Sequence, residues 1–358
     1  MKRPCAIASR SRDTAGRAAS LDWHCGFAAA ALTPAALHSH SRARELREAA
    51  RGGNTENTEV NLARRLCHTR LAGEYGRSVH GVRYMDKQRQ QAARFRALHE
   101  SGVFVIPNVW DGASAAIMTG LGFEALATSS AACAATLGKL DGEVTREESL
   151  LHARLIVSVS ECPVAADLEN GFGHAPETVA ETIRLAIGAG LAGGSIEDAS
   201  GDPRAPIYEF AHAVERVTAA VQEAHHASLH FVLTARAENF LHGRSDLDDT
   251  VRRLQAFEAA GADVLFAPGL PDLAAVRTVC SALKKPVNFM IGIPGKSFAV
   301  ADLAAAGVRR ISLSTSLYRA AITGLLSAAH EISERGTFSY VESIVSGGEI
   351  ARYLRPPD

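Results

Sequence analysis

The chain has 358 residues, of which 47% are hydrophobic and 22% are charged, and its formal net charge is −1. This length fits one large domain or two average ones, and the composition is typical of a globular protein with a sizeable core. The small net charge gives no strong field toward nucleic acid or a membrane surface, so we expect neither as a partner. No apolar run reaches the roughly 18 residues that crossing a bilayer requires.

Six cysteines are scattered along the chain and form no CxxC pair. This spacing indicates reduced thiols rather than a disulfide framework or a zinc site. We therefore expect a cytoplasmic protein.

Residues 1–84 differ in character from the rest. Lys and Arg outnumber Asp and Glu by 14 to 7 up to Arg83, whereas the remainder has 24 against 32. Strand-forming residues are few, and Gly52-Gly53-Asn54 interrupts the best helical pattern. We predict a disordered extension, or a non-native one translated from too early a start codon, with Met85 as the working initiator. An Arg-rich organelle transit peptide is the alternative, and the length and acidic residues of the segment argue against it.

From Met85 onward, apolar runs of strand length alternate with stretches of helical length. The eight runs are Val103 to Trp110, Ala125 to Ser130, Pro163 to Leu168, Gly194 to Glu197, Phe231 to Arg236, Asp263 to Pro268, Pro286 to Ile291 and Arg310 to Ser314. Eight strands, each followed by a helix, in about 250 residues indicate an α/β fold of the (β/α)8 TIM barrel type over residues 85–358. An open doubly wound sheet is the alternative, but the Gly-rich turn expected after its first strand is missing.

Helix ends support this division of the chain. The clearest predicted helices are Arg146 to Ser160, Ala175 to Ala189, Tyr208 to His226 and Leu247 to Ala260. Glycines follow predicted helix ends at Gly122, Gly190, Gly261 and Gly307, where a left-handed backbone commonly ends a helix.

Acidic residues gather where the predicted strands end. Asp167 and Glu169 close the third strand and, by alternation, should point the same way; Glu197 closes the fourth, and the loop after the second supplies Asp141. The carboxyl ends of barrel strands form one face, on which the active sites of such enzymes lie. Carboxylates that converge there repel one another unless a cation lies among them, and all-oxygen ligands favour Mg²⁺.

Arg236, at the end of the fifth strand, would clamp a substrate carboxylate opposite that ion. The alternative is that these charged residues form structural ion pairs at helix N-termini. Tyr208, just beyond the loop after the fourth strand, should touch the substrate if that loop closes.

Several short motifs, in order and spacing, resemble the isocitrate lyase and phosphoenolpyruvate mutase superfamily over Gln88 to Leu354. They are Ala127-Thr128-Ser129-Ser130-Ala131, Leu137-Gly138-Lys139-Leu140-Asp141-Gly142, Asp167-Leu168-Glu169-Asn170-Gly171-Phe172-Gly173, Ile196-Glu197-Asp198 and Ala235-Arg236-Ala237-Glu238. The resemblance implies a Mg²⁺-dependent barrel that acts on 2-oxo or enol carboxylates. It also implies a homo-oligomer, a dimer or tetramer, in which the last helix is exchanged.

The resemblance also implies a role for each matched residue. Asp167 would bind Mg²⁺ directly, while Glu169, Glu197 and Asp141 would hold its waters. Ser129 and the backbone N–H groups of Ser130 and Ala131 would bind the substrate anion, and Arg236 its carboxylate side. We take Arg236, Ser129 and Glu197 as the catalytic candidates.

The loop after the fourth strand departs from the lyases of that superfamily. Their Lys-Lys-Cys-Gly-His loop, which carries the catalytic Cys, is replaced by Ala199-Ser200-Gly201-Asp202-Pro203-Arg204-Ala205-Pro206. We therefore expect a lyase that cleaves or decarboxylates a small, oxaloacetate-like 2-oxo or 2-hydroxy acid through an enolate, with Arg204 on the distal carboxylate. A phosphonate mutase or hydrolase is one alternative, and a non-catalytic barrel that binds a keto acid is another.

Overall fold

The computed structural model describes residues 79–354, with side chains from Asp86 onward. The predicted extension over residues 1–84 therefore lies almost entirely outside the described residues. Helix α3 (Val79–Ala97) runs across Met85, so the predicted boundary falls within a helix.

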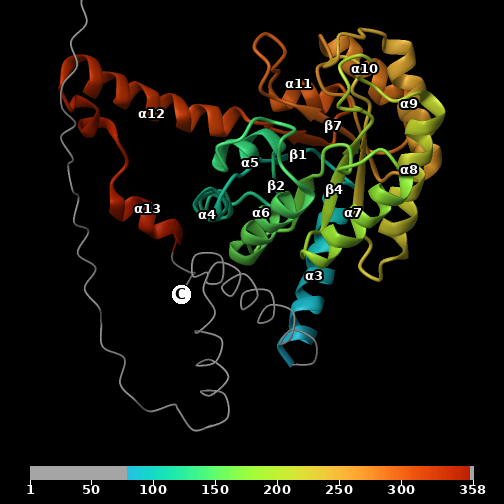
Figure 1. The fold of residues 1–358 in the computed structure, drawn as a ribbon, viewed down its shortest axis with the longest axis horizontal. Helices are drawn as coiled ribbons and strands as arrows, with labels where there is room; N and C mark the ends of the chain where they lie inside the picture. Colours follow the sequence, from blue (N-terminus) through green and yellow to red (C-terminus); the bar gives the residue numbers. More distant parts are fainter. Residues whose placement is uncertain (1–78, 355–358) are drawn as a thin grey trace, which may run out of the picture. The chain divides into compact units, whose positions relative to one another are not determined.

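The described chain forms a (β/α)8 barrel, as the alternation of strands and helices predicts (Figure 1). Its strands are β1 (Phe104–Ile106), β2 (Leu126–Ala127), β3 (Val164–Asp167), β4 (Gly193–Glu197), β5 (Val232–Arg236), β6 (Val264–Phe266), β7 (Val287–Met290) and β8 (Arg310–Ser312). All pairings are parallel, in the order β1-β8-β7-β6-β5-β4-β3-β2. A parallel bridge between Asn108 and Ala127 joins β1 to β2 and closes the ring.

Helices surround these strands. After α3 they are α4 (Gly112–Gly120), α5 (Ser130–Thr136), α6 (Arg146–Val159), α7 (Pro176–Gly188), α8 (Phe210–His226), α9 (Leu247–Ala260), α10 (Leu273–Ala282), α11 (Val300–Ala305), α12 (Ser316–Arg335) and α13 (Gly347–Leu354), with a 3-10 turn at η1 (Ser339–Ser343). The four glycines predicted to follow helix ends all have positive φ, between 87° and 105°.

Helix α3 closes the N-terminal end of the barrel. Its Phe95 is fully buried, and a Cβ at Gly193, the first residue of β4, would lie 2.7 Å from the Phe95 ring. His99 and Phe104 meet edge to face beside Phe95, with ring centroids 5.0 Å apart. Phe95, His99 and Phe104, here called the aromatic plug, fill this end of the barrel. The opposite end, where the strands finish, is the open mouth of the barrel.

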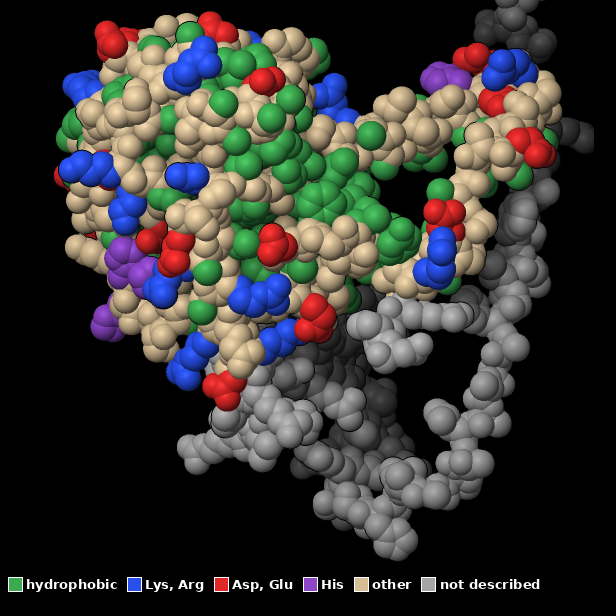
Figure 2. Space-filling model, turned by 180° about the vertical axis from the view of Figure 1, so that it is seen from behind, with side chains coloured by type: hydrophobic (Ala, Val, Ile, Leu, Met, Phe, Trp, Pro, Cys, Tyr) green, Lys and Arg blue, Asp and Glu red, His purple; other side chains and the backbone are tan. Residues whose placement is uncertain are grey.

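Helix α12 projects from the barrel, and α13 returns to pack against α4 (Figure 1). Close packing is visible at Gly120, where a Cβ would lie 2.7 Å from the ring of Tyr353. Leu325 and Leu326 on α12 are more than half exposed, as is Phe338 just after it. Hydrophobic side chains also gather on the barrel surface next to α12 (Figure 2). Among the described helices, none is both long and apolar enough to cross a membrane.

Candidate active site

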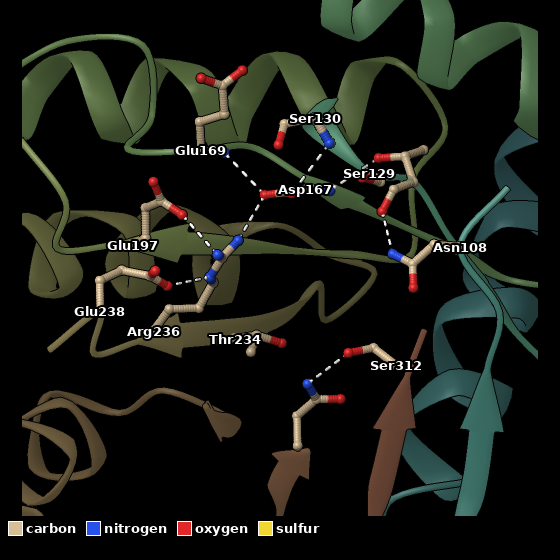
Figure 3. A network of polar contacts seen from close by, with 12 residues as sticks. Asn108, Ser129, Ser130, Asp167, Glu169, Glu197, Thr234, Arg236, Glu238 and Ser312 are labelled. Atoms are coloured by element: carbon tan, nitrogen blue, oxygen red, sulfur yellow. Dashed lines mark hydrogen bonds and ion pairs between the residues drawn. The ribbon is translucent and has the colours of Figure 1, made fainter. Parts of the chain in front are cut away.

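Arg236 lies at the centre of the barrel mouth and contacts three carboxylates (Figure 3). Its Nη1 is 2.9 Å from Asp167 Oδ1, its Nη2 is 2.9 Å from Glu197 Oε2, and its Nε is 2.8 Å from Glu238 Oε1. Burial lowers the pKa of Arg236, but the three carboxylates outweigh it and raise the pKa well above the usual value. Three negative charges therefore share one positive charge in a nearly buried cluster.

Backbone amides fix the orientation of Asp167. The Ser130 N–H donates to its Oδ2 at 3.2 Å, and the Glu169 N–H lies 3.3 Å from its Oδ1. Its own N–H donates to the Thr128 hydroxyl at 3.0 Å. The carboxylate at the end of β3 is thus held rigidly toward the centre of the mouth.

The mouth holds more carboxylates than Arg236 can pair, and several of them have raised pKa values. Burial, with Asp167 and Asp141 nearby, raises the pKa of Glu169 to about 7. Burial is also the main cause that raises the pKa of Glu197 and the pKa of Asp141. Glu169 has left the strand, with a φ of 49°, and its carboxylate points away from Arg236 (Figure 3). Such a charge excess fits a cation.

Strand alternation separates Glu197 from its neighbour. Glu197 faces the mouth, whereas Asp198 faces outward and accepts hydrogen bonds from Arg253 at 3.0 Å and from the Glu238 N–H at 2.8 Å. Glu238 is 2% exposed and joins both networks, a role that the sequence analysis did not assign. Its position two residues after Arg236 was the available signal.

The residues predicted to bind the substrate occupy different surroundings. Ser129 is buried in the mouth and caps α5 by accepting from the Ala132 N–H at 3.4 Å. Ala131, in the first turn of the same helix, is partly exposed, and the Ser130 N–H is already bonded to Asp167. Tyr208 donates to or accepts from His174 Nδ1 at 2.6 Å and does not line the central cavity. Its contact with a substrate stays a prediction.

The loop after β4 is short and internally bonded. The Ser200 hydroxyl donates to the Ala205 carbonyl at 2.6 Å, and the Ser200 N–H donates to Pro206 at 2.9 Å. The side chain of Arg204 is 90% exposed and pairs with Asp202 of the same loop at 2.9 Å. Arg204 is therefore engaged within its own loop rather than directed into the mouth.

A cavity of about 90 Å³ extends from the mouth into the barrel. It is lined by Ile106, Asn108, Ala127, Thr128, Ser129, Ala165, Ala166, Asp167, Gly194, Ser195, Thr234, Arg236, Phe266, Asn288, Met290, Arg310, Ser312 and Ser314. Five polar lining residues were not predicted from the sequence, because none of them is an acid at a strand end or lies in a matched motif: Asn108, Thr234, Asn288, Arg310 and Ser312. Asn108 ties the closing strands together by donating to Thr128 and accepting from the Leu313 N–H.

The mouth carboxylates supply oxygen donors but not a closed ligand set. Within the described residues, the single His, Cys, Asp or Glu group whose ligand atoms all lie within 4.8 Å is His225, His230 and Asp263, on the opposite side of the strands. Asp167, Glu169, Glu197 and Asp141 are spaced more widely. That spacing suits a hard cation that keeps several waters, which the outer carboxylates could hold.

The chain is similar to known proteins in sequence and in fold. The sequence pattern of the family described as phosphoenolpyruvate phosphomutase matches residues 95–333. The chain belongs to this family. It is thus a member of the isocitrate lyase and phosphoenolpyruvate mutase superfamily, which confirms the resemblance seen in the motifs, and its relatives are lyases and mutases.

Three relatives in this superfamily show how the similarity is distributed. A solved structure from Burkholderia cenocepacia J2315, provisionally named a lyase/mutase, is 48% identical, covers 76% of this chain and 98% of its own, and has a TM-score of 0.74. Oxaloacetate decarboxylase of Paraburkholderia xenovorans (strain LB400) is 31% identical over 73% of this chain and 88% of its own. 2-Methylisocitrate lyase of Escherichia coli (strain K12) is 32% identical over 56% of this chain and 69% of its own.

Proposed function

We propose that this family member is a Mg²⁺-dependent lyase that decarboxylates or cleaves a small 2-oxo or 2-hydroxy diacid of the oxaloacetate type. The observation that carries the proposal is Arg236 surrounded by acids at the mouth of a cavity of about 90 Å³. A polar cavity of this kind can take up waters or a small organic acid.

The donor set fits Mg²⁺. Asp167 would bind the ion, and Glu169, Glu197 and Asp141 would hold its waters. Burial, and then the nearby charges of Asp167 and Asp141, raise the pKa of Glu169 to about 7, and a cation would offset those neighbouring charges. When bound, the ion supplies stabilisation for negative charge on the 2-oxo oxygen of the substrate.

Arg236 performs the complementary task. The bond that breaks at C3 of the substrate leaves its electron pair on an enolate, which then takes a proton at C3. A fixed guanidinium, buried where water cannot screen it, stabilises the charge of that enolate and its carboxylate. The hydroxyl of Ser129, at the edge of the same cavity, orients the substrate carboxylate.

The loop after β4 supports a compact substrate. It contains neither the Cys nor the Lys pair of the tricarboxylate lyases, and its internal bonds to Ser200 make it stiff. We therefore propose turnover of C4 to C5 acids and no turnover of isocitrate or 2-methylisocitrate.

Phosphonate chemistry is the second candidate, because the matched family is described as a phosphomutase. It would use the same mouth and the same enol. The loop after β4 offers Ser200 and Asp202 as groups that could carry a phosphoryl group, but the Ser200 hydroxyl donates to the Ala205 carbonyl and the Asp202 carboxylate pairs with Arg204. A non-catalytic keto-acid-binding barrel is less well supported, since every acid of the proposed cation site is present.

We further propose that the protein forms a homo-oligomer through α12 and the segment after it. Leu325, Leu326 and Phe338 are 62%, 52% and 62% exposed, and apolar side chains gather beside α12 (Figure 2). An exposed apolar surface of this kind is typical of an interface. Light scattering that reports a monomer at micromolar concentration would contradict this proposal.

One assay tests the function. Pyruvate release is measured from oxaloacetate and from 2-methyl-substituted malates, and pyruvate or phosphoenolpyruvate formation is measured from phosphonopyruvate, each with Mg²⁺ and with EDTA. We expect Mg²⁺-dependent release from a C4 diacid. Release from phosphonopyruvate alone would favour the second candidate, and glyoxylate release from isocitrate would contradict the proposed substrate size.

A further inference from the structure

Arg310 is a buried cation for which the sequence analysis gave no role. It is the first residue of β8 and is 5% exposed, yet it lines the same cavity as Arg236. Its neighbour Arg309 is exposed and donates to the Gly102 carbonyl at 3.1 Å. The two adjacent arginines thus face opposite sides of the barrel wall.

The partners of Arg310 are all neutral. Its Nε donates to Asn288 Oδ1 at 2.8 Å, and its Nη2 donates to the Thr234 hydroxyl at 2.9 Å. Its Nη1 lies 3.4 Å from His99 Nε2. No carboxylate of residues 86–354 lies within ion-pair distance of this guanidinium, in contrast to the three around Arg236.

His99 cannot supply the missing negative charge. Its Nδ1 is 2.8 Å from the Phe95 carbonyl, which can only accept, so Nδ1 carries the hydrogen and Nε2 is left to accept from Arg310. Burial, followed by the nearby Arg310 charge, lowers the pKa of His99 to about 3. His99 is therefore a neutral acceptor for the Arg310 guanidinium, on the side of α3.

A buried charge without a counter-ion is costly, and proteins usually pair it with a charge of opposite sign. Here the unpaired cation borders a cavity whose other end carries an excess of carboxylates. Asn288 Nδ2 donates to the Ser312 hydroxyl at 3.0 Å on the same wall, which adds polar groups beside it. The cavity is thus acidic at the mouth and basic at the floor.

We infer that Arg310 forms an anion-binding floor that receives the distal carboxylate of a small diacid, while the 2-oxo or 2-hydroxy acid end lies at the mouth. The inference rests on the proposed function for the orientation of the substrate. It assigns the second carboxylate to Arg310 inside the barrel, instead of to Arg204 on the outer loop.

Equilibrium binding tests the inference, and product assays on the same samples verify that L-malate stays intact during the titration. L-malate and 2-hydroxybutanoate have the same chain length and differ by a distal carboxylate in place of a methyl group. Each is titrated calorimetrically with Mg²⁺ present into the wild-type protein and into Arg310→Met, with Arg309→Met as the matched control. We expect Arg310→Met to weaken malate binding at least tenfold and to leave 2-hydroxybutanoate within twofold, whereas Arg309→Met changes neither.

A purely structural role for Arg310 would weaken both ligands equally or neither, and either result overturns the inference. If Arg310→Met does not fold, Arg310→Lys replaces it, because lysine keeps the charge but lacks the planar guanidinium. We then expect the affinity for L-malate to fall at least threefold while the affinity for 2-hydroxybutanoate is unchanged. A selective loss of phosphonopyruvate with unchanged malate binding would show a floor for phosphonate instead of carboxylate. Arg204→Ala is titrated in parallel, and selective loss of malate there would return the distal carboxylate to the outer loop.

This result is separable from the proposed function. If oxaloacetate is not turned over but Arg310→Met still loses malate selectively, the lyase proposal fails and the floor stands. If oxaloacetate is turned over and Arg310→Met leaves its KM unchanged, the floor fails and the lyase proposal stands.

Discussion

Asp167 shows how a single carboxylate can be fixed without belonging to the core. Two backbone N–H groups and Arg236 hold its side chain, which is 18% exposed. Because these contacts come from β5, α5 and its own strand end, its position depends on the whole mouth. Its removal should therefore affect the site more than the fold.

We expect Asp167→Ala to abolish Mg²⁺-dependent turnover while the melting temperature stays within a few degrees of wild type. Arg236 keeps Glu197 and Glu238 as partners, so no unpaired buried cation results. Turnover is measured with and without Mg²⁺, and Glu169→Asp serves as a mild control because it shortens one side chain and keeps the charge. Activity within about tenfold of wild type, roughly 1.4 kcal/mol of barrier, would show that the cation site lies elsewhere.

Buried His99 should make the free energy of unfolding depend on pH. Its folded-state pKa of about 3 lies below the ordinary histidine pKa of 6.5, so between these pH values the unfolded chain binds a proton that the folded protein does not bind. The stability that neutral His99 allows is present above pH 6.5 and is lost progressively as the pH falls toward 3. The loss approaches about 1.4 kcal/mol per pH unit for one proton.

Urea denaturation between pH 7 and pH 4.5 checks the direction of this pH dependence. Wild type should lose stability over the range more steeply than His99→Leu, which cannot take up a proton. His242→Leu is the control, because His242 is exposed and its replacement leaves the buried His99 in place. Equal slopes for wild type and His99→Leu would contradict the assignment.

At the scale of elements, the strand and helix pattern was largely predictable. Seven of the eight strands lie within the predicted runs, β4 begins one residue earlier than predicted, at Gly193, and α9 begins and ends where predicted, at Leu247 and Ala260. The reason is local: each strand is a short, mostly buried run, and many helices are followed by a glycine or begin on a capping side chain such as Thr145 or Asp246.

The interior of the cavity was less predictable than the mouth. Acids at strand ends stand out in the sequence, but Arg310 starts a strand and looks like its exposed neighbour Arg309. Only the three-dimensional register, which sets Arg310 beside Asn288 and Phe104, shows which arginine faces inward. Likewise, the left-handed backbone of Glu169 breaks the alternation on which its predicted direction relied.

The contact between α4 and α13 gives a prediction for one element. A methyl group at Gly120 would lie 2.7 Å from Tyr353, closer than atoms pack, so Gly120→Ala should loosen α13 at a typical overpacking cost of about 1–3 kcal/mol. Hydrogen exchange of α13 should become faster by at least fivefold. Gly188→Ala on α7 is the matched control, because its methyl group meets nothing within 4 Å. Unchanged exchange in Gly120→Ala would mean that α13 does not rest on this glycine.

At the scale of the whole molecule, the core begins after Met85. Gln88 donates to the carbonyls of Ile187 and Leu191, and Ala92 and Phe95 are fully buried. A chain that starts at Met85 loses the first six residues of α3 and keeps all of these contacts.

We therefore expect the chain that starts at Met85 to fold and to keep full activity. A chain that starts at Leu98, which lacks Phe95, should fail to fold, because it leaves the N-terminal end of the barrel open. Circular dichroism, melting temperature and turnover are compared for both. Loss of activity in the first chain would show that residues 1–84 contribute to function.

The aromatic plug also determines the route by which substrate and products would enter and leave in the proposed reaction. Phe95 and Phe104 fill the end of the barrel below Arg310, so in the proposed reaction the substrate and both products would share one doorway at the mouth. For the proposed reaction, the fragment held at the mouth, pyruvate, occupies that doorway until it leaves. Pyruvate should then compete with the substrate in steady-state kinetics and raise the apparent KM for the substrate without lowering kcat. A barrel closed at one end would thus make the enzyme subject to inhibition by its own product.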